Sequence, residues 1–122
     1  MTTVVNVKVE YIRPKYNNLK EWMKEPNHIY IGRKGIVFIN NERYPKKDSL
    51  WANPFKISKK MTREMVLPAY KNYIINKLDN GIISRDELMN LNGKVLGCWC
   101  KHPICKISCH GDILIELLTK YQ

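Results

Sequence analysis

Two segments near the end of the chain decide its fold: Val95-Leu96-Gly97-Cys98-Trp99-Cys100, and Cys109-His110-Gly111-Asp112-Ile113-Leu114. The first alternates between two faces and predicts a strand over 94–100. The second opens a predicted helix over 111–121, with Asp112 in a first turn that favours negative charge. Because strands and helices alternate along the rest of the chain, we expect an α/β domain with a mostly parallel sheet.

The other elements follow from periodicity and from turn residues. Pro68 predicts a kink or a late start in the longest helix, and Ser84 with Glu87 forms a capping box. We expect the strands to be central, with the helices over 62–80 and 111–121 covering the sheet. Strands are predicted over 3–10 and 28–33, a hairpin over 35–44 with Asn40-Asn41 as its turn, and further helices over 18–25, 62–80 and 84–91.

Length and composition indicate one globular domain over residues 1–122. The apolar fraction is 44% and the charged fraction 26%, which is ordinary for a globular protein. The chain lacks an apolar run of about 20 residues, the length needed to span a bilayer. Its N-terminus does not have the layout of a signal peptide. We therefore expect a protein of the reducing cytoplasm, without a membrane partner and with its cysteines as thiols.

The net charge of +10 predicts an anionic partner, such as a nucleotide, a nucleic acid or another acidic surface. Codon bias offers a second explanation. Lys, Asn and Ile together make 42 of the 122 residues, and all three have A/T-rich codons. A low-GC genome raises the Lys content without any selection for charge.

The four cysteines all lie between positions 98 and 109, and two of the three histidines, His102 and His110, lie within or directly after this segment. Cys98 and Cys100 share one face of the predicted strand, with Cα atoms about 6.7 Å apart, which suits two thiolates on one tetrahedral metal. Three interpretations remain open: a zinc site, a reactive thiol site without metal, and buried structural cysteines that pack as small hydrophobic groups. The zinc site would use Cys98, Cys100, Cys109 and one of His110, Cys105 or His102.

The start of the last helix is a candidate site for an anionic ligand. His110 and Asp112 would supply acid–base chemistry, and Gly111 would allow the backbone to approach a phosphate or a sugar. The alternative is that Asp112 is only a first-turn charge that favours the helix dipole.

Other candidates follow strands or lie in loops. Arg33 follows a predicted strand and a glycine, where ligands bind parallel sheets, and would hold a phosphate or a carboxylate. The alternative is a solvated arginine at the surface. Trp51 would stack on a base and Asn53 would read polar edges, although core packing explains Trp51 equally well. Asn6 is unusual within a strand, and a buried Asn needs a ligand or a neighbouring loop as a partner.

The chain resembles the domain-of-unknown-function family 4326 (DUF4326), small proteins of bacteria, phages and large DNA viruses. The resemblance covers nearly the whole chain, and the family brings no established activity. It implies a site made of Asn6, Arg33, Trp51, Asn53, Cys98, Cys100, Cys109, His110 and Asp112. The motifs that carry it are Val4-Val5-Asn6-Val7, Tyr30-Ile31-Gly32-Arg33, Ser49-x-Trp51-Ala52-Asn53-Pro54-Phe55, Thr62-Arg63-Glu64, Tyr70-x-x-Tyr73, Leu96-Gly97-Cys98-Trp99-Cys100 and Cys109-His110-Gly111-Asp112-Ile113-Leu114.

This sequence departs from the family pattern in two places. A 15-residue insertion, residues 34–48, separates Arg33 from the Trp51 motif, and Ala52 replaces a usual glycine. The link between Cys100 and Cys109 is also longer, with the additional residues His102 and Cys105. We expect the insertion to form a β-hairpin for partner binding.

These observations predict a single α/β domain with a mostly parallel, Rossmann-like sheet, flanked by helices and carrying an inserted hairpin. The first functional hypothesis is an enzyme or binding domain for a nucleotide-derived or other phosphorylated ligand at the strand ends. The second is a non-catalytic basic module, zinc-stabilised or metal-free, that binds nucleic acid or a protein. The third is a structural or assembly protein that forms oligomers through the 35–44 hairpin. A viral member would act in the host cytoplasm or in the virion.

Overall fold

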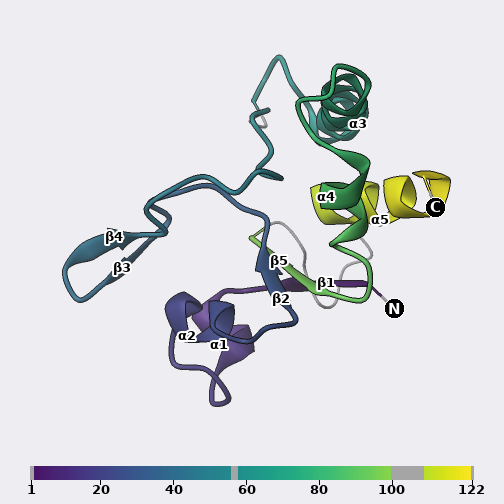
Figure 1. The fold of residues 1–122 in the computed structure, drawn as a ribbon. Coiled ribbons are helices and arrows are strands. Elements are labelled where there is room, and N and C mark those ends of the chain that lie inside the picture. The colour runs from purple at the N-terminus through teal and green to yellow at the C-terminus, as the bar shows by residue number, and fades with distance from the viewer. Residues whose placement is uncertain (1, 56–57, 100–108, 122) are drawn as a thin grey trace.

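The structure is a computed structural model that describes residues 2–55, 58–99 and 109–121. The described residues form five strands and five helices, whose arrangement can be followed in Figure 1. The strands are β1 (Thr3–Asn6), β2 (His28–Tyr30), β3 (Val37–Ile39), β4 (Glu42–Tyr44) and β5 (Val95–Cys98). The helices are α1 (Val9–Ile12), α2 (Leu19–Met23), α3 (Arg63–Asp79), α4 (Arg85–Met89) and α5 (His110–Tyr121).

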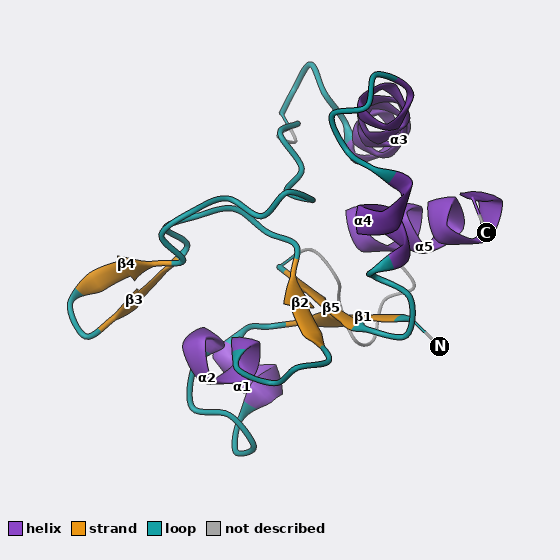
Figure 2. Ribbon diagram, in the orientation of Figure 1, coloured by secondary structure: helices purple, strands orange, loops and turns teal. Residues whose placement is uncertain are grey.

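The central sheet is parallel, with the strand order β1-β5-β2. The register pairs Asn6 with Cys98 and Tyr30 with Gly97, so the carboxyl ends of the three strands meet at one edge. Figure 2 shows the second sheet, the β3-β4 hairpin, standing apart from the first. The expected parallel sheet and hairpin are therefore confirmed, while the Rossmann-like architecture stays a prediction.

Two hydrophobic cores lie on the two faces of the central sheet. Along β5, Leu96 and Cys98 pack into the core shared with α3, α4 and α5, whereas Val95 and Trp99 pack with the core of α1 and α2. This alternation confirms the predicted period of two. The helices over 62–80 and 111–121 were expected to cover the sheet. Of these, α5 contacts β1 and β5, and α3 packs mainly against α5.

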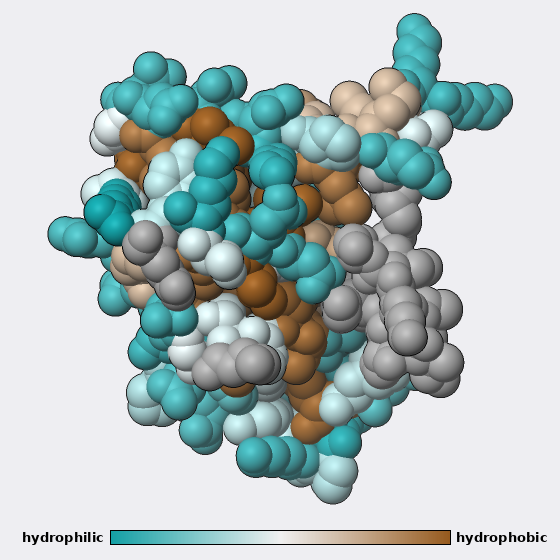
Figure 3. Space-filling model, turned by 90° about the vertical axis from the view of Figure 1, so that its right-hand side faces the viewer, coloured by the Kyte–Doolittle hydropathy of each residue, from teal (hydrophilic) through white to brown (hydrophobic). Residues whose placement is uncertain are grey.

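The surface carries both hydrophobic and hydrophilic residues. Viewed from the side on which α5 ends, hydrophobic residues form a band among hydrophilic ones (Figure 3). Within the described residues, no helix combines the length and the apolar character that a membrane span requires.

Several local predictions are confirmed by the backbone. Asn18 caps α2 by accepting a hydrogen bond from the Glu21 N–H, at 3.0 Å. Ser84 and Glu87 form the predicted capping box of α4. Asn40 and Asn41 have φ values of 52° and 65°, which suits the primed turn of a two-residue hairpin.

Two strand boundaries were predicted wrongly. The strand over 3–10 stops at Asn6, because the Asn6 Oδ1 accepts a hydrogen bond from the Lys8 N–H at 2.9 Å and turns the chain toward α1. The strand over 28–33 ends at Tyr30. The bounds of the longest helix are confirmed, since α3 begins at Arg63 and ends at Asp79, and of the two expectations for Pro68 the late start is wrong because Pro68 lies in the second turn.

Gly97 is required by the packing of the second core. A Cβ atom at this position would lie 2.5 Å from the Trp22 ring and 2.6 Å from a Val7 methyl group. Both of those side chains are buried. The glycine of the Gly-Cys-Trp-Cys motif therefore lets α2 approach the middle strand.

We expect the Gly97→Ala substitution to lower the free energy of unfolding by about 1–3 kcal/mol, because the added methyl group overpacks this contact. Urea denaturation checks the value, with Thr3→Ala at an exposed position of β1 as the control. A Gly97→Ala midpoint equal to that of the wild type would contradict the packing account.

Candidate functional site

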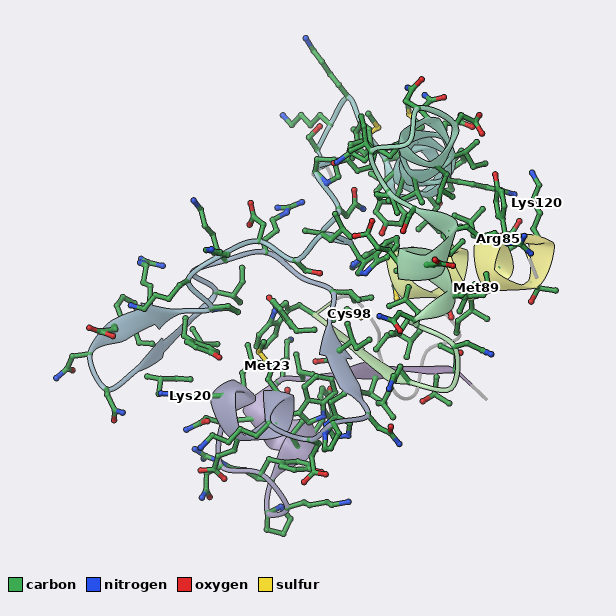
Figure 4. All side chains as sticks on the ribbon, in the orientation of Figure 1. Lys20, Met23, Arg85, Met89, Cys98 and Lys120 are labelled. Carbon is green, nitrogen blue, oxygen red and sulfur yellow. The ribbon has the colours of Figure 1, made fainter. Side chains whose placement is uncertain are left out.

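The carboxyl edge of the central sheet gathers most of the predicted site residues. Asn6 and Cys98 end neighbouring strands, and Arg33 follows the third strand by three residues. The first turn of α5 reaches the same edge through His110. Figure 4 places Cys98 in the middle of the molecule, where β5 ends beside β2.

His110 joins the start of α5 to the end of β2. Its Nε2 lies 2.7 Å from the carbonyl oxygen of Ile31, and since a carbonyl only accepts, Nε2 carries a proton and donates it. The ring is 6% exposed and meets Tyr70 edge to face, with centroids 5.2 Å apart. Burial lowers the pKa of His110 below its ordinary value, although the Ile31 hydrogen bond opposes the shift. The imidazole is therefore neutral at pH 7.

Cys109 and Cys98 bring α5 against the middle strand. Their Sγ atoms lie 3.5 Å apart, and both side chains are buried. The backbone N–H of Cys109 donates to the Asp112 Oδ2 at 2.8 Å. Asp112 thus caps its own helix, as the helix-dipole interpretation expected.

Gly111 packs against the sheet face. A Cβ atom on Gly111 would lie 2.8 Å from both methyl groups of Val4 and 3.1 Å from the Ile31 side chain. The absence of a side chain at Gly111 therefore lets α5 pack closely against the sheet, and it is the sheet that occupies the space expected for a phosphate or a sugar.

A chain of hydrogen bonds fixes Arg33 beside this edge. The Trp99 Nε1–H donates to the Tyr30 hydroxyl at 2.8 Å, and that hydroxyl donates to the Arg33 carbonyl oxygen at 2.7 Å. Burial raises the pKa of Tyr30 to about 12, despite the Trp99 hydrogen bond that lowers it, so the hydroxyl stays protonated and remains a donor. The Arg33 Nε donates to the Asn53 carbonyl oxygen at 2.8 Å, and Nη2 donates to the Phe55 carbonyl oxygen at 3.4 Å.

The loop that receives Arg33 is itself packed down. Trp51 is 5% exposed and lies in the same core as Tyr70, whose hydroxyl donates to the Trp51 carbonyl oxygen at 2.6 Å. The Asn53 Oδ1 accepts from the Phe55 N–H at 2.9 Å, which holds the turn. Core packing thus accounts for the burial of Trp51, and base stacking stays a prediction.

Asn6 finds its partners in the nearby backbone. Besides the Lys8 contact, its Nδ2 donates to the Trp99 carbonyl oxygen, although this contact is long at 3.5 Å. The expected need of a buried Asn for partners is met by a neighbouring loop at the strand ends.

The zinc interpretation also stays a prediction. Cys98 and Cys109 meet, while His110 points to Ile31 and Cys100, His102 and Cys105 lie outside the described residues. Among the residues that are described, no group of three or more His, Cys, Asp or Glu side chains could hold a metal ion.

Sequence reasoning missed Tyr30, Trp99 and Tyr70 as parts of the site. All three carry a polar atom on a large aromatic body, and such residues seek a hydrogen-bond partner when they are buried. Tyr30 and Trp99 also lie within the quoted motifs, which was the available signal.

Comparison with known proteins gives the family. The sequence profile described as "Domain of unknown function (DUF4326)" matches residues 15–120. The chain belongs to this family. It is 35% identical over 104 residues to "Uncharacterized protein R718" of Acanthamoeba polyphaga mimivirus, covering 77% of this chain and 71% of that protein.

A second relative comes from a phage. The chain is 32% identical over 59 residues to the "Uncharacterized 12.4 kDa protein in nrdA-td intergenic region" of Enterobacteria phage T4. This match covers 48% of the chain and 51% of the phage protein. No solved structure matches the chain.

We expect the wild-type protein to lose stability as the pH falls from 7 to 5. His110 has a folded pKa below the unfolded value near 6.5, so below that pH the unfolded state binds the additional proton. In the His110→Gln variant, the amide retains a donor for Ile31 but does not titrate. Its stability should be lower at pH 7 and should fall less toward pH 5. Urea denaturation measures both proteins. An equal loss of stability in the wild type and in the variant between pH 7 and pH 5 would refute a buried neutral His110.

Proposed function

We propose that this domain binds a nucleotide-derived or other phosphorylated ligand at the carboxyl edge of the β1-β5-β2 sheet, with Arg33 as the anion contact. The observation that carries the proposal is the setting of Arg33. Its guanidinium is oriented by two backbone carbonyl groups, and within the described part of the chain it has no carboxylate partner. A fixed and uncompensated cation favours an anionic ligand.

The position of Arg33 supports the same conclusion. Ligands of parallel sheets bind beyond the carboxyl ends of the strands, and Arg33 follows β2 at that edge. The half-buried guanidinium has a smaller hydration shell to lose than a fully exposed one would have. The net charge of +10 would attract a phosphorylated ligand from a distance.

Binding is better supported than acid–base catalysis. The side chains proposed for proton transfer, His110 and Asp112, are both engaged in holding the first turn of α5. A general base has to reach the proton that it removes. We therefore propose a binding function first. An enzymatic role for His110 and Asp112 would require that a bound substrate releases these side chains from their contacts in α5.

The β3-β4 hairpin favours a second candidate function, the binding of single-stranded nucleic acid. Phe38 on β3 is 65% exposed, and the Arg43 guanidinium carbon lies 4.6 Å from its ring centroid. The hairpin stands away from the body of the molecule (Figure 1). An exposed ring next to a cation is the combination that stacks on unpaired bases and contacts their phosphates.

For the first function, we expect Arg33→Gln to weaken binding of a nucleoside monophosphate by about tenfold or more, since a charged hydrogen bond contributes about 1.5–3 kcal/mol. Calorimetric titration of the wild type with inorganic phosphate and with nucleoside mono- and diphosphates provides the reference. Arg33→Lys retains the charge without the fork and should lie between the two.

Arg85→Gln, at an exposed position of α4, is the matched control and should bind as the wild type does. Failure of the wild type to bind any of these anions, or equal affinity of the Arg33→Gln variant, would contradict the proposal.

For the second function, we expect Phe38→Ala to weaken binding of a single-stranded oligonucleotide by about 5- to 100-fold, because stacking on one base contributes about 1–3 kcal/mol. Fluorescence anisotropy at two salt concentrations measures this loss. Ile82→Ala, at another exposed apolar position, is the control. Affinity that depends on neither Phe38 nor salt would exclude this hairpin as a nucleic-acid surface.

A further inference from the structure

We propose that Cys98 and Cys109 form a redox-active dithiol, a site whose substrate is a low-molecular-weight disulfide such as glutathione disulfide. The carrying observation is the 3.5 Å contact between the two Sγ atoms. Neither the family relationship nor the proposed ligand site assigns such chemistry to this pair. The proposal is independent of anion binding at Arg33.

The geometry suits a cross-link. The two sulfur atoms need to approach by about 1.5 Å to reach the length of a disulfide bond. Cys98 is the last residue of β5, and Cys109 directly precedes the first residue of α5. The bond would therefore join two elements that are already in contact, and the main elements of the fold would not have to move.

The surroundings of the pair keep its two members in place. The Cys98 carbonyl oxygen accepts a hydrogen bond from the Val7 N–H at 3.0 Å, and the Cys109 N–H is held by Asp112. The neighbouring residue His110 anchors the same turn to Ile31. Because backbone bonds hold both residues, the sulfur atoms face each other in a lasting arrangement, and intramolecular attack is favoured.

The exchange balances without any further oxidant. The thiolate of one cysteine attacks the small disulfide, forms a mixed disulfide and expels one small thiolate. The second cysteine thiolate attacks the protein sulfur of that mixed disulfide and expels the other. The protein loses two hydrogens, and two small thiols leave with them.

Burial predicts the kinetics of this site. The side chains of Cys98 and Cys109 are 0% and 1% exposed, so exchange requires the first turn of α5 to open. The oxidised form then closes a loop of 12 residues, from 98 to 109. Closing this loop restricts the unfolded chain, which makes the oxidised protein the more stable form.

The experiment uses the full chain with Cys100→Ser and Cys105→Ser, so that only the proposed pair remains. Equilibration with excess glutathione disulfide should remove two hydrogens per chain and leave no thiol that an alkylating reagent can modify. The melting temperature should rise by about 10 °C and should return after dithiothreitol treatment.

Further substitution to Cys98→Ser or Cys109→Ser provides the control, in which neither the internal cross-link nor the shift should form. The proposal is overturned if both thiols stay open to alkylation after equilibration in the double variant. It is also overturned if the purified wild-type protein contains one equivalent of zinc that blocks both thiols until a chelator removes it. Neither outcome depends on whether Arg33 binds an anion.

Discussion

The docking of the first turn of α5 onto the carboxyl edge of the sheet is the contact on which the rest of the structure depends. His110 donates to Ile31 after β2, and Cys109 meets Cys98 at the end of β5. Gly111 lets the helix approach the side chain of Val4 on β1. Residues 109–111 thus contact β1, β5 and the residue that follows β2. Since α3 and α4 pack on α5, this turn also positions the larger of the two cores.

The candidate ligand site, at Arg33 and the loop around Asn53, lies at the same carboxyl edge of the sheet. Two short hydrogen bonds, from Trp99 to Tyr30 and from Tyr30 to the Arg33 carbonyl oxygen, fix the Arg33 backbone relative to the ends of β5 and β2. Arg33 in turn holds the loop around Asn53. A side chain that is fixed before a ligand arrives loses little conformational freedom on binding. The polar network therefore explains both how the loop is held and why Arg33 can act as a ready anion contact.

Much of this arrangement could be predicted from the sequence. Period two along β5 and the capping residues of α2 and α4 are local signals, and local signals predicted these elements correctly. The rule that ligands of parallel sheets bind beyond the strand ends pointed to Arg33, and the resemblance to DUF4326 added Asn6 and Cys98 to the same expected site. The strand over 3–10 was predicted too long, because β-branched residues do not reveal that the Asn6 side chain turns the backbone at Lys8.

The roles of the individual side chains could not be predicted in this way. Whether Asp112 acts on a ligand or on the Cys109 N–H depends on a rotamer, and whether Gly111 faces a phosphate or Val4 depends on the tertiary packing. The contact between Cys98 and Cys109 joins residues on different elements, and spacing alone does not fix it.

The most direct test of the central claim is a titration of the isotope-labelled protein with a nucleoside monophosphate, followed by backbone amide NMR shifts. The account predicts saturable shifts concentrated at Gly32, Arg33, Asn53 and Trp99, and shifts confined to the β3-β4 hairpin, or none at all, would contradict it.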